Sequence, residues 1–162
     1  MTTLFQFQAR KIERMAASLA HFVATTAPAR LNWSPATDEH SSTRSVLSQV
    51  AECVGVNEYS AALLRGETPA PFPPQNGAAM PVLSGSDDAQ KRLLDSGQTL
   101  AAAVRALDED ALTRIYHHWR GPLPGEIIIE MGYRNMAYHA GQINLIQLLN
   151  GDAEFHVPPS WL

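Results

Sequence analysis

The sequence contains a single cysteine, Cys53, and few charged residues, which make up 17% of its 162 residues. One cysteine excludes an internal disulfide bond and is typical of proteins from a reducing compartment. Lys and Arg are scattered along the chain and the formal net charge is −4, so the basic stripe that a phosphate backbone requires is missing. We therefore expect a cytoplasmic protein with no nucleic-acid partner.

Long apolar runs and the signature motifs of common enzyme classes are also missing. The longest uninterrupted apolar runs are far shorter than the ~20 residues of a membrane span. Lys11, Glu13, Arg14 and His21 interrupt the apolar core that a secretory signal would need. No Ser-His-Asp signature, phosphate-binding glycine loop or dinucleotide fingerprint occurs. The sequence thus predicts no membrane partner and offers no standard catalytic motif.

Four segments have the hydrophobic spacing of amphipathic helices, at about residues 3–25, 41–64, 86–107 and 126–149. Residues 66–86 hold five prolines and form a long connection, which lets the third helix run parallel to the second. For residues 108–121 the sequence allows two structures, a short helical turn or an extended segment at 114–120. The sequence predicts an all-α, four-helix bundle with a long crossover connection between helices 2 and 3, built as one domain over residues 1–162.

The segment from Glu126 to Leu149 has one stripe of residues in steps of three and four, which predicts one face of a helix. Its members are Ile128, Met131, Asn135, His139, Gln142, Leu145 and Leu149. Most are aliphatic, as a buried face requires, but Asn135, His139 and Gln142 are polar. Gln49 likewise interrupts the inward stripe of the second helix. Because buried polar groups need partners, these four polar residues mark a candidate site.

Several short motifs resemble the DinB-like superfamily. The run YHAGQI at residues 138–143, followed by LLNG at 148–151, resembles the closing helix of that family. Residues 30–35 and 41–50 resemble its first connector and the start of its second helix. The resemblance covers nearly the whole chain and implies a compact four-helix bundle and a homodimer. The family also includes relatives of thiol-dependent transferases and isomerases.

Members of this family that bind a divalent metal typically use three histidines, one on the second helix and two spaced four apart on the fourth. Laid on this sequence, that pattern places Gln49, Asn135 and His139 at the ligand positions. Amide oxygens are weak, hard donors for zinc or nickel compared with imidazole. The resemblance therefore implies a degenerate metal site with His139 as its main ligand, and the two missing histidines favour a protein without a cofactor.

Other donors are weaker candidates on the sequence alone. Glu52 and Glu130 do not lie cleanly on the inward stripes. Cys53 lies one turn after Gln49, and on an apolar helix face we expect it to be an inert core residue rather than a nucleophile. His117 and His118 are adjacent and point apart, so they make a poor chelating pair. We expect one of them to be exposed and the other to pack beside Trp119.

Three interpretations of the polar centre remain open. Gln49, Asn135, His139 and Gln142 form a closed hydrogen-bond network, or they line a metal-free pocket for an organic ligand, or they hold a divalent metal. The first two lead to a small-molecule-binding or interaction module. The third leads to a divalent-metal-dependent transferase or hydrolase that acts on a thiol or a polar small molecule. The substrate and the reaction do not follow from the sequence.

Overall fold

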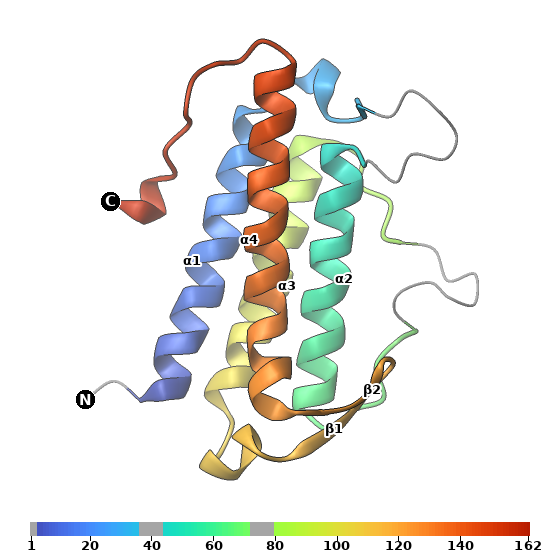
Figure 1. Ribbon diagram of the computed structural model, residues 1–162, viewed down its shortest axis with the longest axis vertical. Helices are drawn as coiled ribbons and strands as arrows, with labels where there is room; N and C mark the ends of the chain where they lie inside the picture. Colours follow the sequence, from blue (N-terminus) through green and yellow to red (C-terminus); the bar gives the residue numbers. More distant parts are fainter. Residues whose placement is uncertain (1–2, 36–43, 72–79) are drawn as a thin grey trace.

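The computed structural model describes residues 3–35, 44–71 and 80–162 of the chain, and it is mostly helical (Figure 1). The long helices are α1 (Leu4–Thr25), α2 (Val46–Leu64), α3 (Ser86–Arg105) and α4 (Gly125–Leu149). Short 3-10 helices are η1 (Pro28–Arg30), η2 (Glu109–Leu112) and η3 (Pro159–Trp161). Two strands, β1 (Ile115–His118) and β2 (Gly121–Pro124), form a hairpin.

Local side-chain chemistry defines the helix ends. At the start of α1, Thr3 and Gln6 form a capping box in which each side chain accepts from the backbone N–H of the other. The Ser45 hydroxyl caps α2, whereas residues 41–43, where the sequence predicts that this helix begins, lie outside the described residues. Gly66, with φ of 73°, follows the last turn of α2, a position that favours glycine because its backbone is left-handed.

The four long helices pack side by side, with α1 and α2 each lying against both α3 and α4. Figure 1 shows α2 and α3 running in the same direction, as expected from the long connection between them, of which residues 72–79 lie outside the described part. Large apolar side chains from all four helices are fully buried between them. They include Ile12, Leu19, Val50, Val54, Leu93, Leu100, Ile128, Met136 and Ile143. Their burial supplies the main stabilising free energy of the fold.

The stripe predicted for α4 coincides with its buried face only in part, at Ile128 and His139. Leu145 and Leu149 are more than half exposed, at 53% and 58%, whereas Gly132, Met136 and Ile143 are buried. The face that packs into the core is therefore centred on the residues next to the predicted ones. The physical reason is that helix α4 is apolar over much of its circumference, so spacing alone does not fix its rotation. The predicted stripe instead borders α2, with Met131, Asn135 and Gln142 half-buried.

The hairpin corrects the purely all-α prediction. Residues 108–121 contain both alternatives that the sequence left open, because η2 is followed, after two residues, by β1. Ile115 pairs with Pro124 and His118 with Gly121, and Trp119 and Arg120 form the turn between the strands. The backbone N–H of Trp119 donates to the Tyr59 hydroxyl at 3.1 Å, which attaches the turn to α2. The hairpin thereby covers one end of the space between α2 and α4.

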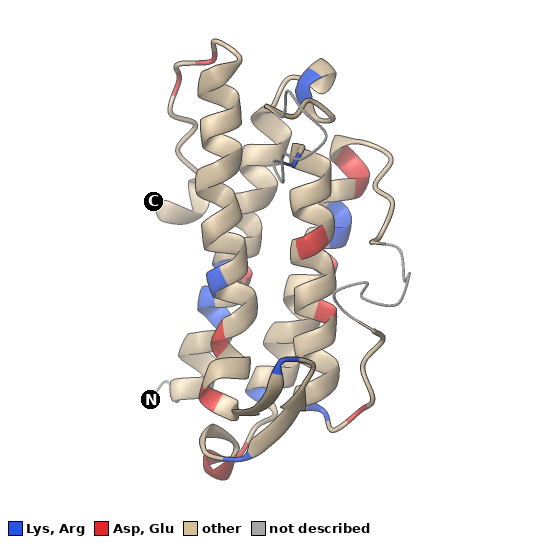
Figure 2. Cartoon of the chain, turned by 45° about the vertical axis from the view of Figure 1, so that its right-hand side comes forward, with Lys and Arg blue, Asp and Glu red and all other residues tan. Residues whose placement is uncertain are grey.

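The charged residues do not gather on one element. Figure 2 shows Lys and Arg interspersed with Asp and Glu along the helices. Across residues 3–35, 44–71 and 80–162, none of the helices combines the length and apolar character that a membrane crossing demands.

Candidate functional site

His139 lies at the centre of the predicted polar cluster and is almost fully buried, with 4% of its surface exposed. Its Nδ1 atom lies 3.1 Å from Gln49 Oε1 and 2.9 Å from Gln142 Oε1. The Gln49 amide nitrogen donates to the carbonyl oxygen of Arg44 at 3.0 Å, which turns the amide oxygen toward the ring. Since two carbonyl oxygens face Nδ1, this nitrogen is the donor, and a neutral ring carries its lone pair on Nε2.

Glu52 faces the other side of the same ring. Its Oε1 atom lies 3.4 Å from His139 Nε2 and accepts from the Asn135 side-chain amide at 3.2 Å. Its Oε2 atom forms an ion pair with Arg44. His139 Nε2 and Asn135 Oδ1 are both buried and have no hydrogen-bond partner among the described residues. Glu52 therefore binds Asn135 and lies next to His139 without a hydrogen bond to it, although the sequence pattern placed Glu52 off the inward stripe.

Burial controls the protonation of this cluster. Burial lowers the pKa of His139, the hydrogen bond to Gln142 opposes that change, and the charge of Arg44 lowers the pKa further. The imidazole is therefore neutral near pH 7. Cys53 is fully buried, and burial raises the pKa of its thiol far above the usual range. Its thiolate is not accessible near neutral pH, so Cys53 behaves as the core residue that the sequence analysis expected.

The donors implied by the three-histidine pattern do not converge on one point. Gln49 contacts Nδ1 of His139, whereas Asn135 lies on the Nε2 side, where it binds Glu52. Among the described residues, no group of three or more His, Cys, Asp or Glu side chains could hold a metal ion. The set of Gln49, Asn135 and His139 does not fit a metal centre in this geometry. Gln49 and Gln142 instead orient the ring.

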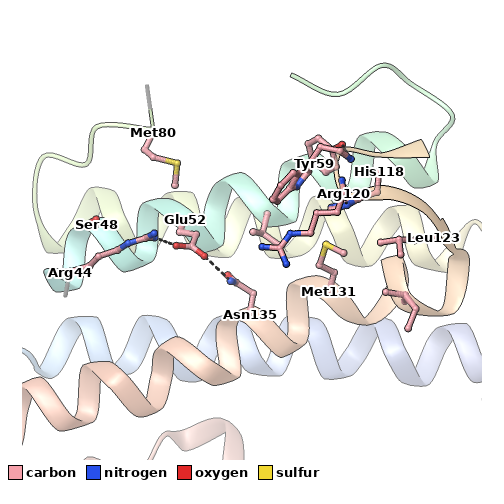
Figure 3. A pocket seen from close by; sticks show the side chains of 13 residues that line it. Arg44, Ser48, Glu52, Tyr59, Met80, His118, Arg120, Leu123, Met131 and Asn135 are labelled. Carbon is pink, nitrogen blue, oxygen red and sulfur yellow. Dashed lines mark hydrogen bonds and ion pairs between the residues drawn. The ribbon is translucent and has the colours of Figure 1, made fainter. Parts of the chain in front are cut away.

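A cleft of about 740 Å³ lies between α2 and α4 and extends from Arg44 to the hairpin. Its apolar wall includes Val56, Met80, Leu123, Ile127 and Met131. Its polar lining includes Arg44, Ser48, Glu52, Tyr59, His118, Arg120 and Asn135 (Figure 3). The Arg44–Glu52 ion pair and the Glu52–Asn135 hydrogen bond lie at one end, and the hairpin residues lie at the other (Figure 3).

A smaller cavity of about 370 Å³ lies beside this cleft. It is lined by His139, Gln49, Gln142 and Tyr138, together with the C-terminal leucines of α4. Arg44 and Glu52 line both cavities. The four residues that the sequence singled out are therefore divided, because Asn135 faces the large cleft and the other three face the small cavity.

The hairpin contributes functional candidates that the sequence analysis did not select. His118 is buried against Tyr59, with ring centroids 5.4 Å apart, and also contacts Trp119, while His117 is exposed. This matches the expectation that one of the two adjacent histidines packs beside Trp119. The guanidinium of Arg120 lies 4.6 Å from the centre of the Trp119 ring. In the sequence, the only indication of these candidates is that His118, Trp119 and Arg120 are adjacent. No local pattern predicts that the turn formed by Trp119 and Arg120 contacts α2.

The fold and the cleft define a mostly helical protein with a ligand-sized space between two of its helices. A model of the DinB superfamily matches residues 11–143, which is most of the chain, so the chain belongs to the DinB superfamily. No curated protein matches the sequence. A crystal structure of a conserved protein from Enterococcus faecalis is similar, with a TM-score of 0.73 and 14% sequence identity. The match covers 93% of this chain and 99% of that chain, and at this identity it shows a shared fold.

Proposed function

We propose that this chain is a single-domain, DinB-type four-helix bundle that binds an organic small molecule in the cleft between α2 and α4, without a resident metal. The observation that carries the proposal is the cleft of about 740 Å³, with an apolar wall and polar groups at both ends. Ligand sites in proteins are typically apolar clefts of ~300–1,000 Å³ that contain a few well-placed polar groups. The volume and the lining of this cleft agree with that description.

The hydrogen bonds that the polar residues make with one another support a binding site without a metal. The Gln49 and Gln142 side-chain oxygens accept from His139 Nδ1, and the Gln49 amide nitrogen donates to the backbone. Among the described residues the buried Asn135 Oδ1 has no hydrogen-bond partner, and the Asn135 side chain lines the cleft. An unpaired buried acceptor costs free energy. Because this oxygen is buried, a ligand that donates an O–H or N–H group would reach it only after a shift of the Asn135 side chain, and would then remove this cost.

Calorimetric titration with phenylbutyrate, phenylbutanol and phenylbutylamine tests the proposal. These probes share an apolar body of suitable size and differ in the charge of the head group. Met131→Trp fills the cleft, whereas Leu94→Trp adds the same side chain at a partly exposed position of α3 outside it. We expect binding to the natural chain and to the Leu94 variant, and loss of binding in the Met131 variant. Absence of binding by all three probes would contradict the proposal.

A second function is a divalent-metal-dependent transferase or hydrolase acting on a thiol or a polar small molecule. One observation favours it: the Nε2 atom of His139 has no hydrogen-bond partner within the described part of the chain and lies 3.4 Å from the Glu52 carboxylate. These two side chains, in place of Gln49, would hold zinc or nickel. A bound ion would supply Lewis-acid chemistry that lowers the pKa of a thiol or water. His139 and Glu52 would position the ion against the cleft.

Elemental analysis after dialysis against zinc or nickel separates the two functions. For the metal-free binding module we expect no retained metal and no effect of a chelator on the melting temperature. Stoichiometric metal in the natural chain that is absent from His139→Ala would establish the second function instead. The His139→Ala variant must keep the helical circular dichroism of the natural chain for this comparison to count.

The proposal includes a homodimer in the cytoplasm, which the family resemblance and the single cysteine suggest. Tyr138, Leu145, Leu148 and Leu149 are exposed on α4, and an exposed apolar patch of this kind supports an interface between copies. Light scattering coupled to gel filtration measures the mass directly. A monomer at all concentrations would remove this part of the proposal.

A further inference from the structure

The charges that line the cleft are not balanced. At one end Arg44 forms an ion pair with Glu52, so that these two charges offset each other. At the hairpin end Arg120 is exposed, and no carboxylate of the described residues pairs with it. Figure 3 shows its side chain extending from the hairpin into the space between α2 and α4, toward Met131 and Asn135. Among the described residues, one positive charge without an ion-pair partner therefore faces an apolar cleft, in a chain whose net charge is −4.

Neighbouring contacts hold Arg120 in this position. Its guanidinium lies 4.6 Å from the centre of the Trp119 ring, a cation–π arrangement. Its backbone N–H donates to His118 Nδ1 at 3.1 Å, and the N–H of Trp119 donates to the Tyr59 hydroxyl. The turn that carries the guanidinium is thus tied to α2 and to the preceding strand. Stacking on a ring leaves the N–H edge of a guanidinium free, which is the edge that binds carboxylates in a bidentate manner.

His118 adds no second charge to this end of the cleft. Because it accepts the Arg120 N–H at Nδ1, its ring proton lies on Nε2. Burial lowers the pKa of His118, and the charge of Arg120 lowers it further, so the ring is neutral near pH 7. The hairpin end therefore offers a single positive charge. A singly charged carboxylate matches it, whereas a doubly charged phosphate would leave one negative charge without a partner.

We propose that the ligand of the cleft is an organic monocarboxylate, with its carboxylate bound by Arg120 and its apolar body lying along Val56, Ile127 and Met131. This assignment rests on the proposed small-molecule function and names the class of ligand for the same cleft. The side chains named for the apolar body line the cleft on both of its helices. Trp119 contributes the surface on which the guanidinium is held.

The same three probes test the assignment, because phenylbutyrate, phenylbutanol and phenylbutylamine differ only in their head groups. We expect phenylbutyrate to bind about tenfold more tightly than phenylbutanol, since a hydrogen bond to a charged group adds roughly that factor. Phenylbutylamine should bind more weakly than the alcohol. The preference for the acid should decrease as the salt concentration rises, because part of it is electrostatic.

Charge-removing variants locate the effect. Arg120→Gln should abolish the preference for the acid and leave the affinity for phenylbutanol unchanged. Arg134→Gln, which removes the same charge from an exposed position of α4 outside the cleft, should keep the preference. Equal affinities of acid and alcohol for the natural chain, or a preference that survives Arg120→Gln, would overturn the assignment while the proposed binding function stands. No binding by any probe would overturn both.

Discussion

Two glycines of α4 provide the sharpest test of the packing described above, because they occupy opposite environments on one helix. A Cβ atom added at Gly132 would lie 2.5 Å from Asn57 Oδ1 and closer still to Leu100 Cδ2. A Cβ atom added at Gly141 would meet nothing within 4 Å. Both positions lie inside a helix, where alanine is preferred over glycine by about 1 kcal/mol. Gly141→Ala should therefore stabilise the protein by up to ~1 kcal/mol.

At Gly132 the same gain is outweighed by overpacking. Asn57 and Leu100 are fully buried, so neither can move out to solvent to make room. Asn57 is also held by hydrogen bonds from its side-chain nitrogen to Ser96 Oγ at 3.2 Å and to Met136 Sδ at 3.5 Å. Forcing a methyl group into a filled core costs ~1–3 kcal/mol. After the helix-propensity gain, Gly132→Ala should destabilise the fold by up to ~2 kcal/mol.

Urea unfolding followed by far-UV circular dichroism measures both variants under the same conditions. The two alanine variants should differ by ~1–3 kcal/mol, which corresponds to a few degrees of melting temperature per kcal/mol for a domain of this size. In an Asn57→Ala background the cost of Gly132→Ala should shrink, since one of the two clashing atoms is gone. Equal stabilisation by both glycine substitutions would refute the close approach of α4 to α2 and α3 at Gly132.

Two further predictions concern the candidate site. Asn135→Leu should change the free energy of unfolding by less than ~1 kcal/mol, because it removes an unpaired buried oxygen together with one hydrogen bond. His139→Ala should lower the free energy of unfolding by ~2 kcal/mol, because it leaves a cavity and unpaired partners such as Gln49. Equal and negligible effects in urea unfolding would refute the buried network. Since burial and then the charge of Arg120 lower the pKa of His118 from 6.5, the unfolded chain binds more protons, and stability should fall as the pH drops below about 6.5. His118→Gln should make that decline shallower in unfolding measurements across this pH range, and an unchanged slope would contradict it.

Much of the helical fold followed from the sequence, because periodic apolar spacing and helix caps are local signals. The first helix, the last turn of the second at Gly66 and the buried Cys53 all agree with the structure. The hairpin did not follow in full. Its second strand contains Pro122 and Pro124, which cannot donate ladder hydrogen bonds, so the strand lacks the usual alternating pattern. Its pairing with β1 is evident from the structure and not from its own sequence.

The site was predicted in part for the same reason. Spacing along one helix relates Asn135, His139 and Gln142, and the family pattern adds Gln49 from the second helix. The contribution of Arg120 depends on where a two-residue turn meets a helix that lies some sixty residues earlier in the sequence, as the hydrogen bond between Trp119 and Tyr59 shows. A contact between residues so far apart in the sequence produces no periodic pattern from which it could be predicted. The electrostatic character of the cleft therefore could not be read from composition or spacing.

The place of Glu52 shows why a ligand pattern cannot be carried over by residue positions alone. Glu52 follows Gln49 by three residues, so on α2 both side chains point toward α4. They nevertheless address different nitrogens of one ring, since Gln49 contacts Nδ1 of His139 and Glu52 faces Nε2. An imidazole has one lone pair when neutral, and the nitrogen that carries it decides which neighbour belongs to a ligand set and which only orients the ring. In this protein the sequence pattern names Gln49, while the geometry places Glu52 and its partner Asn135 on the Nε2 side of the ring, which is the side with the lone pair.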